Sequence, residues 1–204
     1  MRGDSSLETP GHPRWLLLPL EGDVDVAATR VVEDLIGDIA SRDFVEDTIA
    51  MVAGAARTVR QQSDELRDQD VLTYAALMLL PAPGLLLPGP VATLRIRPMS
   101  PADTDDDALA LCADLDADRH GQVDVEVLAT PSGRALSVRF RPVVELEDGR
   151  VVNEHRLVLW PRREVGMLLE LSLYSVDLVE AGAAAEPLQE LAESIVWTVD
   201  EAQR

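Results

Sequence analysis

The sequence contains no lysine, and all 18 of its basic residues are arginine. This absence excludes Schiff-base lysines, phosphate-loop lysines and Ser-Lys dyads as mechanisms. Cysteine is almost as scarce, because Cys112 is the only one in the chain and an internal disulfide is therefore ruled out. Its neighbours, Leu109 to Leu111, are apolar with helical character, which favours a small core residue over a nucleophile.

Long hydrophobic runs are also missing. The run 15–20 is short and contains Pro19, and the apolar stretch 77–94 is interrupted by prolines and glycines. Neither can form a helix that spans a bilayer. The N-terminus carries Asp4 and Glu8 and does not resemble a signal peptide. We therefore expect a cytoplasmic protein without membrane insertion.

Positive charge is outnumbered, with 18 basic against 37 acidic residues and a net charge of −19. Nucleic acids and anionic membrane surfaces repel such a chain, so we expect no nucleic-acid partner. The charge is uneven, since the segment 133–163 has seven arginines against four acids. We expect a protein partner or a homodimer.

The most regular segment is 133–174, which predicts three antiparallel strands. Leu136, Val138 and Phe140 share one parity, and polar side chains such as Ser137 take the other, as in a half-buried strand. Asp148-Gly149 then predicts a tight hairpin, because both residues tolerate positive φ.

The rest of the chain predicts a single α+β domain over 14–204, after a disordered arm at 1–13. A helical hairpin is expected at 26–67, an antiparallel meander at 123–174 and an amphipathic C-terminal helix at 187–199. The expected architecture is a mostly antiparallel sheet of six or seven strands with helices packed on one face.

No group of residues identifies a cofactor or a catalytic centre, and we predict none. The segment after 114 places Asp116, Asp118 and His120 at alternate positions before Gly121, which partly matches a calcium-binding loop. The position that should supply a bidentate glutamate is Val127, however, so an ordinary acidic turn is the alternative. No histidine has a second ligand at zinc spacing.

Five arginines of the meander are candidate partner-binding residues. Arg139 and Arg141 alternate with buried residues and so project from the opposite sheet face, while the facing of Arg156 is ambiguous. Arg162 and Arg163 lie at a hairpin end. The five predict a positive stripe suited to a carboxylate-rich partner. The alternative is that they pair internally, with the acids Glu145, Glu154 and Glu170.

The arrangement over about 103–199 resembles the Mog1/PsbP-like α+β fold, including uncharacterised actinobacterial members. The matching features are the Pro131-x-Gly133 turn, the Asp148-Gly149 hairpin and a final helix that ends at Trp197. The resemblance implies a non-catalytic binding or adaptor domain, since some relatives bind small GTPases or photosystem proteins. The acidic, lysine-free composition also looks like that of accessory proteins of actinobacterial specialised secretion.

Three functions remain as hypotheses. The first is a cytoplasmic protein-interaction or adaptor domain. The second is a small-molecule-binding protein, which predicts a deep apolar cavity between the sheet and the helical hairpin 26–67. The third is an enzyme, which requires two carboxylates facing each other in a cleft with shifted pKa values.

Overall fold

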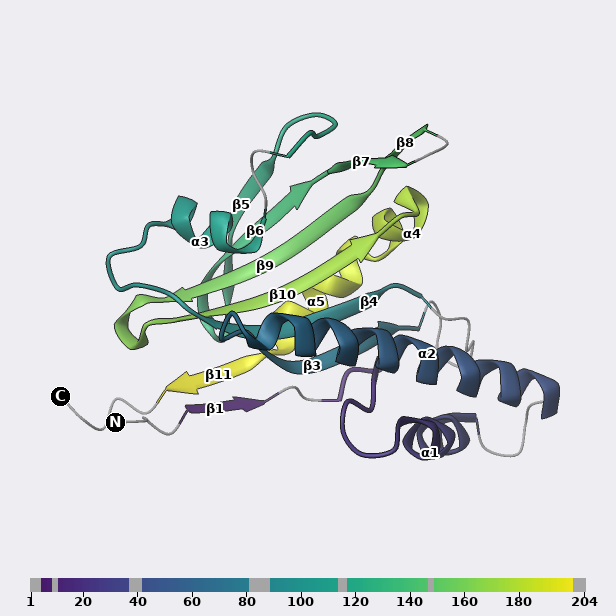
Figure 1. Cartoon of the computed structure of the whole chain (residues 1–204). Helices are drawn as coiled ribbons and strands as arrows, with labels where there is room; N and C mark the ends of the chain where they lie inside the picture. The colour runs from purple at the N-terminus through teal and green to yellow at the C-terminus, as the bar shows by residue number, and fades with distance from the viewer. Residues whose placement is uncertain are drawn as a thin grey trace.

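A computed structural model of the chain describes residues 5–8, 11–36, 42–80, 89–113, 117–146 and 149–199. Its main feature is a seven-stranded antiparallel sheet in the order β2-β3-β4-β10-β9-β6-β5 (Figure 1). The strands of this sheet are β2 (Trp15–Leu17), β3 (Leu72–Leu79), β4 (Val91–Pro98), β5 (Asp124–Thr130), β6 (Gly133–Phe140), β9 (Glu154–Arg162) and β10 (Met167–Ser175). The helices are α1 (Val24–Ile36), α2 (Arg42–Arg67), α3 (Asp105–Cys112), α4 (Leu178–Ala183) and α5 (Ala185–Ser194). The predicted α+β class and the antiparallel sheet are confirmed.

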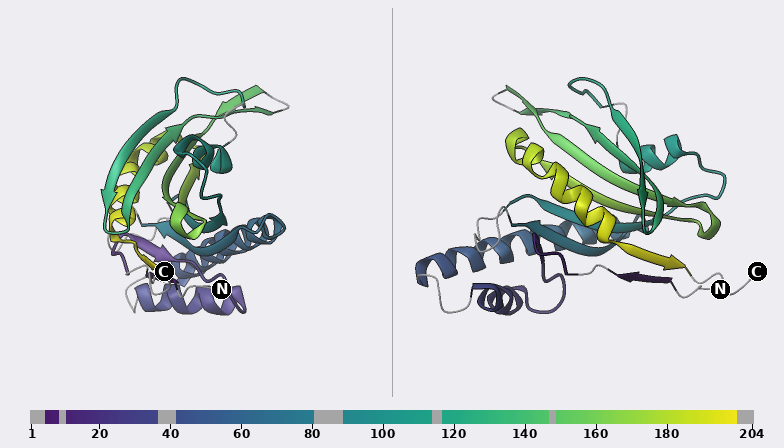
Figure 2. Two further views of the ribbon diagram at one scale, coloured as in Figure 1. Left: turned by 90° about the vertical axis from the view of Figure 1, so that its left-hand side faces the viewer. Right: turned by 180° about the vertical axis from the view of Figure 1, so that it is seen from behind.

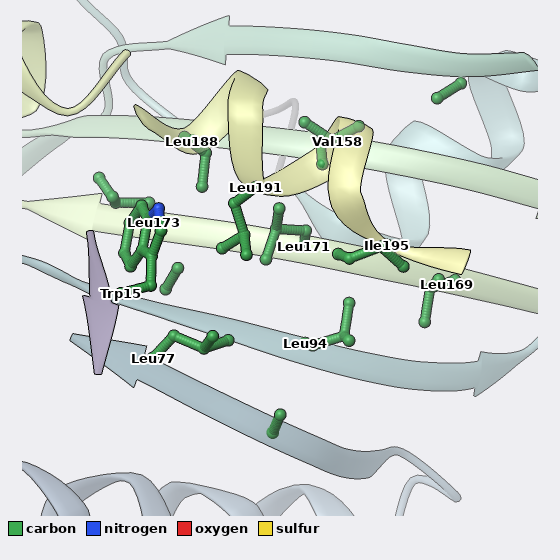
Figure 3. Close-up of a cluster of buried hydrophobic side chains, with 14 of the residues drawn as sticks. Trp15, Leu77, Leu94, Val158, Leu169, Leu171, Leu173, Leu188, Leu191 and Ile195 are labelled. Carbon is green, nitrogen blue, oxygen red and sulfur yellow. The ribbon is translucent and has the colours of Figure 1, made fainter. Parts of the chain in front are cut away.

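One face of the sheet packs against α5. Leu188, Leu191 and Ile195 point from the helix region onto sheet side chains such as Leu94 and Leu171, and all five are buried (Figure 3). Burying a leucine or isoleucine side chain contributes about 1.5–3 kcal/mol, so this amphipathic stripe secures α5 to the sheet.

The other face is covered by α2 with α1 at one end and by α3 at the other, as the two further views show (Figure 2). Ala76 and Met78 of β3 pack against the helical pair, and Leu157 and Leu159 of β9 pack against α3. The expectation that helices cover one face is therefore wrong. The central strands are apolar on both parities, so both faces need cover.

The two ends of the described chain form a second, two-stranded sheet. The strand β1 (Ser5–Glu8) pairs antiparallel with β11 (Val196–Val199), and Leu7 lies opposite Trp197. The disordered arm predicted at 1–13 is wrong for these residues, and the predicted C-terminal helix stops at Ser194 instead of continuing to Val199. The β-branched residues of β11 favour an extended chain once β1 supplies a partner.

The long strands predicted in the meander are interrupted. Pro142 separates β6 from β7 (Val143–Leu146), and Asn153 separates β8 (Gly149–Val152) from β9. The β7–β8 pair therefore forms its own small sheet. Asp148 of the predicted hairpin turn lies outside the described residues, whereas Gly149 has the positive φ of 143° that such a turn requires.

Candidate functional site

Three of the five candidate arginines converge on one buried carboxylate. Arg139 Nη2 and Arg141 Nε each donate to Glu154 Oε2 at 3.0 Å. Arg156 Nη2 lies 2.6 Å from Glu154 Oε1. Burial raises the pKa of Glu154, but the hydrogen bonds from Arg139 and Arg141 and the charge of Arg156 outweigh it and hold the pKa below its ordinary value. Internal pairing, the alternative in the sequence analysis, is therefore present at this cluster.

The other two arginines lie elsewhere. Arg162 pairs with the nearby Glu164 and stacks over the ring of Trp197, 5.3 Å from its centroid. Arg163 pairs with Asp105 at the start of α3. The five arginines thus do not form one continuous stripe, and their binding to a partner stays a prediction.

The residues of the calcium alternative are engaged in other contacts where they are described. Asp116 lies outside the described residues. The Asp118 carboxylate pairs with Arg150, and the backbone N–H of His120 donates to the Arg141 carbonyl at 2.8 Å. Within the described ranges, no group of three or more His, Cys, Asp or Glu side chains could hold a metal ion.

A pocket of about 780 Å³ lies between α2 and the face of the sheet that carries α3. We call it the α2 pocket. Its helical wall includes Ala55, Val59 and Leu66, and Glu180 of α4 also lines it. Its position is the one that the sequence analysis named for a ligand, but the lining mixes polar with apolar side chains and is not purely apolar. The side chains that form its sheet wall are Thr93, Arg95, His155, Ser172 and Tyr174.

These sheet residues come together because of strand register. Ser172 of β10 lies opposite Thr93 of β4, and Tyr174 lies opposite His155 of β9, so their side chains emerge on the same face. The buried hydroxyls of Thr93 and Ser172 are 2.9 Å apart. A hydrogen bond between two hydroxyls uses one of their two protons, so one proton stays free to be donated into the pocket.

His155 lies in an aromatic stack along this wall. Its ring centroid is 4.9 Å from that of Phe140 and 5.9 Å from that of Tyr174. Burial lowers the pKa of His155 to about 4. The negative charge of Glu170 opposes this shift, and the positive charge of Arg95 adds to it. The imidazole is therefore neutral at pH 7 and offers one donor and one acceptor nitrogen.

Arg95 is the charged group of the sheet wall, and it shares Glu170 with Arg97. Arg97 Nη2 donates to Glu170 Oε2 at 2.6 Å, whereas Arg95 Nη1 lies 3.6 Å from Glu170 Oε1. Nε of Arg95 is buried without a hydrogen-bond partner among the described residues. Burial lowers the pKa of Arg95, which is the mark of a charge only partly compensated by its surroundings.

Cys112 of α3 lies near the same carboxylate. Burial, followed by the charge of Glu170, raises the pKa of its thiol, so the thiol is protonated at neutral pH and is a poor nucleophile.

Sequence reasoning did not find the α2 pocket residues. Nothing in the local sequence pattern marks Thr93, Arg95 or Ser172 as site residues. The signal that was available is the presence of polar side chains on strands whose other parity is fully apolar, as with Glu170 and Ser172 among the leucines of β10.

The comparisons with known proteins find little similarity. The sequence matches no family model and no curated protein. The structure is similar to a crystal structure of LpqN, which is involved in cell envelope biogenesis of Mycobacterium tuberculosis. That match has a TM-score of 0.45 and 11% sequence identity, and covers 96% of this chain and 85% of that chain. A likeness this distant does not carry a function from one protein to the other.

Proposed function

We propose that this protein is a non-catalytic binding domain that holds a small organic molecule in the α2 pocket. The observation that carries the proposal is the pocket itself. Its volume of about 780 Å³ falls in the range of roughly 300–1,000 Å³ that is usual for ligand sites. Apolar side chains of α2, such as Val59 and Leu66, face a few convergent polar groups of the sheet, and such a combination can bind and orient a ligand.

The same geometry argues for binding without catalysis. A catalytic histidine needs a partner that fixes its tautomer and a nucleophile within hydrogen-bond reach. The ring of His155 is held by Phe140 and Tyr174, and no hydrogen bond joins it to another described side chain. A serine hydroxyl of the pocket wall, that of Ser172, is hydrogen-bonded to the hydroxyl of Thr93. We therefore assign these groups to ligand orientation.

The test is to close the pocket from its helical wall. The probe is N-phenyl-1-naphthylamine, a neutral aromatic molecule that fluoresces when it leaves water. Ala55→Trp places a large ring in the pocket, and we expect it to weaken probe binding at least tenfold. Gln61→Trp adds the same ring to α2 outside the pocket lining, and should leave binding within about twofold of the unchanged protein. Equal binding by both variants would overturn the proposal.

A protein-interaction role is the second candidate. Val176 and Val179 are 68% and 82% exposed, and Val176 borders the α2 pocket, so this apolar pair is a surface that a partner could cover. Co-purification with the double variant Val176→Ser/Val179→Ser tests it, since an unchanged set of partners would retire the role. The Mog1/PsbP-like kinship, the cytoplasmic location and the link to specialised secretion stay predictions.

A further inference from the structure

The α2 pocket has an unequal distribution of charge between its depth and its rim. Arg95 of the sheet wall belongs to a cluster of two guanidinium groups, its own and that of Arg97, and one carboxylate, of Glu170. The cluster therefore carries one positive charge in excess. We call the solvent-exposed part of the lining the rim, and it carries the opposite sign, because Glu65 of α2 and Glu180 of α4 line the pocket and are exposed.

The excess charge belongs to Arg95 and not to Arg97. Arg97 is engaged on two sides, since Nη1 donates to the Leu111 carbonyl and Nη2 to Glu170, each at 2.6 Å. The guanidinium of Arg95 makes no hydrogen bond within the described part of the chain and meets Glu170 only at 3.6 Å. Its side chain is 15% exposed, so few waters replace the missing partners. A guanidinium in this state favours an incoming anion, with which it forms charge-assisted hydrogen bonds.

Neighbouring groups complete the recognition of such an anion. The free hydroxyl proton of the Thr93–Ser172 pair is a neutral donor next to Arg95, because Thr93 and Arg95 project from the same face of β4. The neutral ring of His155 and the ring of Tyr174 offer aromatic surface to the body of the ligand.

We propose that the α2 pocket selects an organic monoanion: an acid whose single charged group reaches Arg95 and whose apolar or aromatic body lies between α2 and the rings of His155 and Tyr174. This inference rests on the proposed function. The carboxylates of Glu65 and Glu180 repel a second negative charge near the mouth, so nucleotides and other polyanions are disfavoured.

The test compares two probes that share an aromatic skeleton. The sulfonate 8-anilinonaphthalene-1-sulfonate carries one negative charge, and N-phenyl-1-naphthylamine lacks it. We expect the wild-type chain to bind the sulfonate at least tenfold more tightly than the amine. Arg95→Gln should remove this preference while it leaves binding of the amine within about twofold.

Arg57→Gln is the matched control, because it removes a guanidinium from α2 outside the pocket lining and away from Glu170. This control should keep the preference for the sulfonate. Arg95→Lys retains a positive charge at the same position and should keep part of the preference. Loss of the preference in Arg57→Gln as well as in Arg95→Gln would overturn the inference, as would a preference that survives Arg95→Gln.

The two proposals fail in different ways. Probe binding that is indifferent to Ala55→Trp overturns the binding function itself. Binding that Ala55→Trp blocks, but that shows no dependence on the sulfonate or on Arg95, leaves the binding function intact and overturns the selection of an anion.

Discussion

Arg97 and Glu170 form an ion pair in the interior of the described sheet, with Nη2 and Oε2 2.6 Å apart and the two side chains 12% and 2% exposed. The pair joins neighbouring strands β4 and β10 on the face that carries α3. Because Glu170 is nearly inaccessible to water, its carboxylate is stabilised by its arginine partners instead of by solvent.

We expect Arg97→Gln to lower the free energy of unfolding by about 3 kcal/mol, since breaking a buried pair leaves a carboxylate poorly compensated. Arg57→Gln removes a pair with Asp25 whose members are 54% and 72% exposed, and should cost less than about 1 kcal/mol. Urea unfolding of the two variants measures both values. Similar costs would show that Glu170 does not rely on Arg97.

The pH dependence of stability should reveal the neutral state of His155. Its pKa in the folded chain, about 4, lies below the value of 6.5 of a free histidine, so the unfolded chain binds the extra proton first. The free energy of unfolding should therefore fall as the pH is lowered from about 6.5 towards 4. Replacing the imidazole in His155→Gln should remove that part of the slope.

The measurement is urea unfolding at a series of pH values, with His12→Gln as the control, because His12 lies in the N-terminal segment before β2 and is not part of the sheet wall. A slope between pH 4 and 6.5 that is the same in His155→Gln and in the unchanged protein would contradict the assignment.

Ser132 of the β5–β6 turn should contribute strongly to the stability of the fold. Its buried hydroxyl donates to the Ile195 carbonyl at 2.8 Å and accepts from the Trp197 N–H at 2.7 Å, which ties the turn to the start of β11. Ser132→Ala leaves both backbone groups without this partner, and should cost about 1–3 kcal/mol. Thermal unfolding measures the loss, and Ser63→Ala on α2 should stay within about 0.5 kcal/mol.

The rim carboxylates should oppose the binding of anions. Glu65→Gln removes one negative charge from the mouth of the α2 pocket, so we expect it to tighten binding of 8-anilinonaphthalene-1-sulfonate about two- to threefold at low salt. Glu193→Gln on α5 is a close control, because Glu65 and Glu193 each accept a hydrogen bond from a glutamine one turn earlier. Fluorescence titration of both variants gives the comparison, and equal affinities would argue against a role for the rim.

Much of the fold follows from local patterns. The stripe that contains Val52, Ala56 and Val59 predicts α2, and the alternation around Val138 predicts β6, because each element buries one side. The local pattern fails at β11, where Val199 continues the helical spacing of α5. Its extended state depends on Ser5, a residue at the other end of the chain.

The site was harder to predict for the same reason. Thr93 and Ser172 become neighbours only through the pairing of β4 with β10, and α2 covers them from a third part of the sequence. Local periodicity assigns a residue to a face, but it does not say which distant polar groups share that face. The arginines around Glu154 were visible as a group, whereas the choice between an internal and an external partner required the position of the carboxylate.

The pairing of β1 with β11 has a practical consequence for engineering permuted and fused variants of the protein. Ser5 lies directly opposite Val199, so a short turn could connect them and allow circular permutation. Reporter domains attached beyond β1 or beyond β11 would start from the same corner, on the side of the molecule away from α4 (Figure 1). Such fusions should leave the mouth of the α2 pocket open to a ligand.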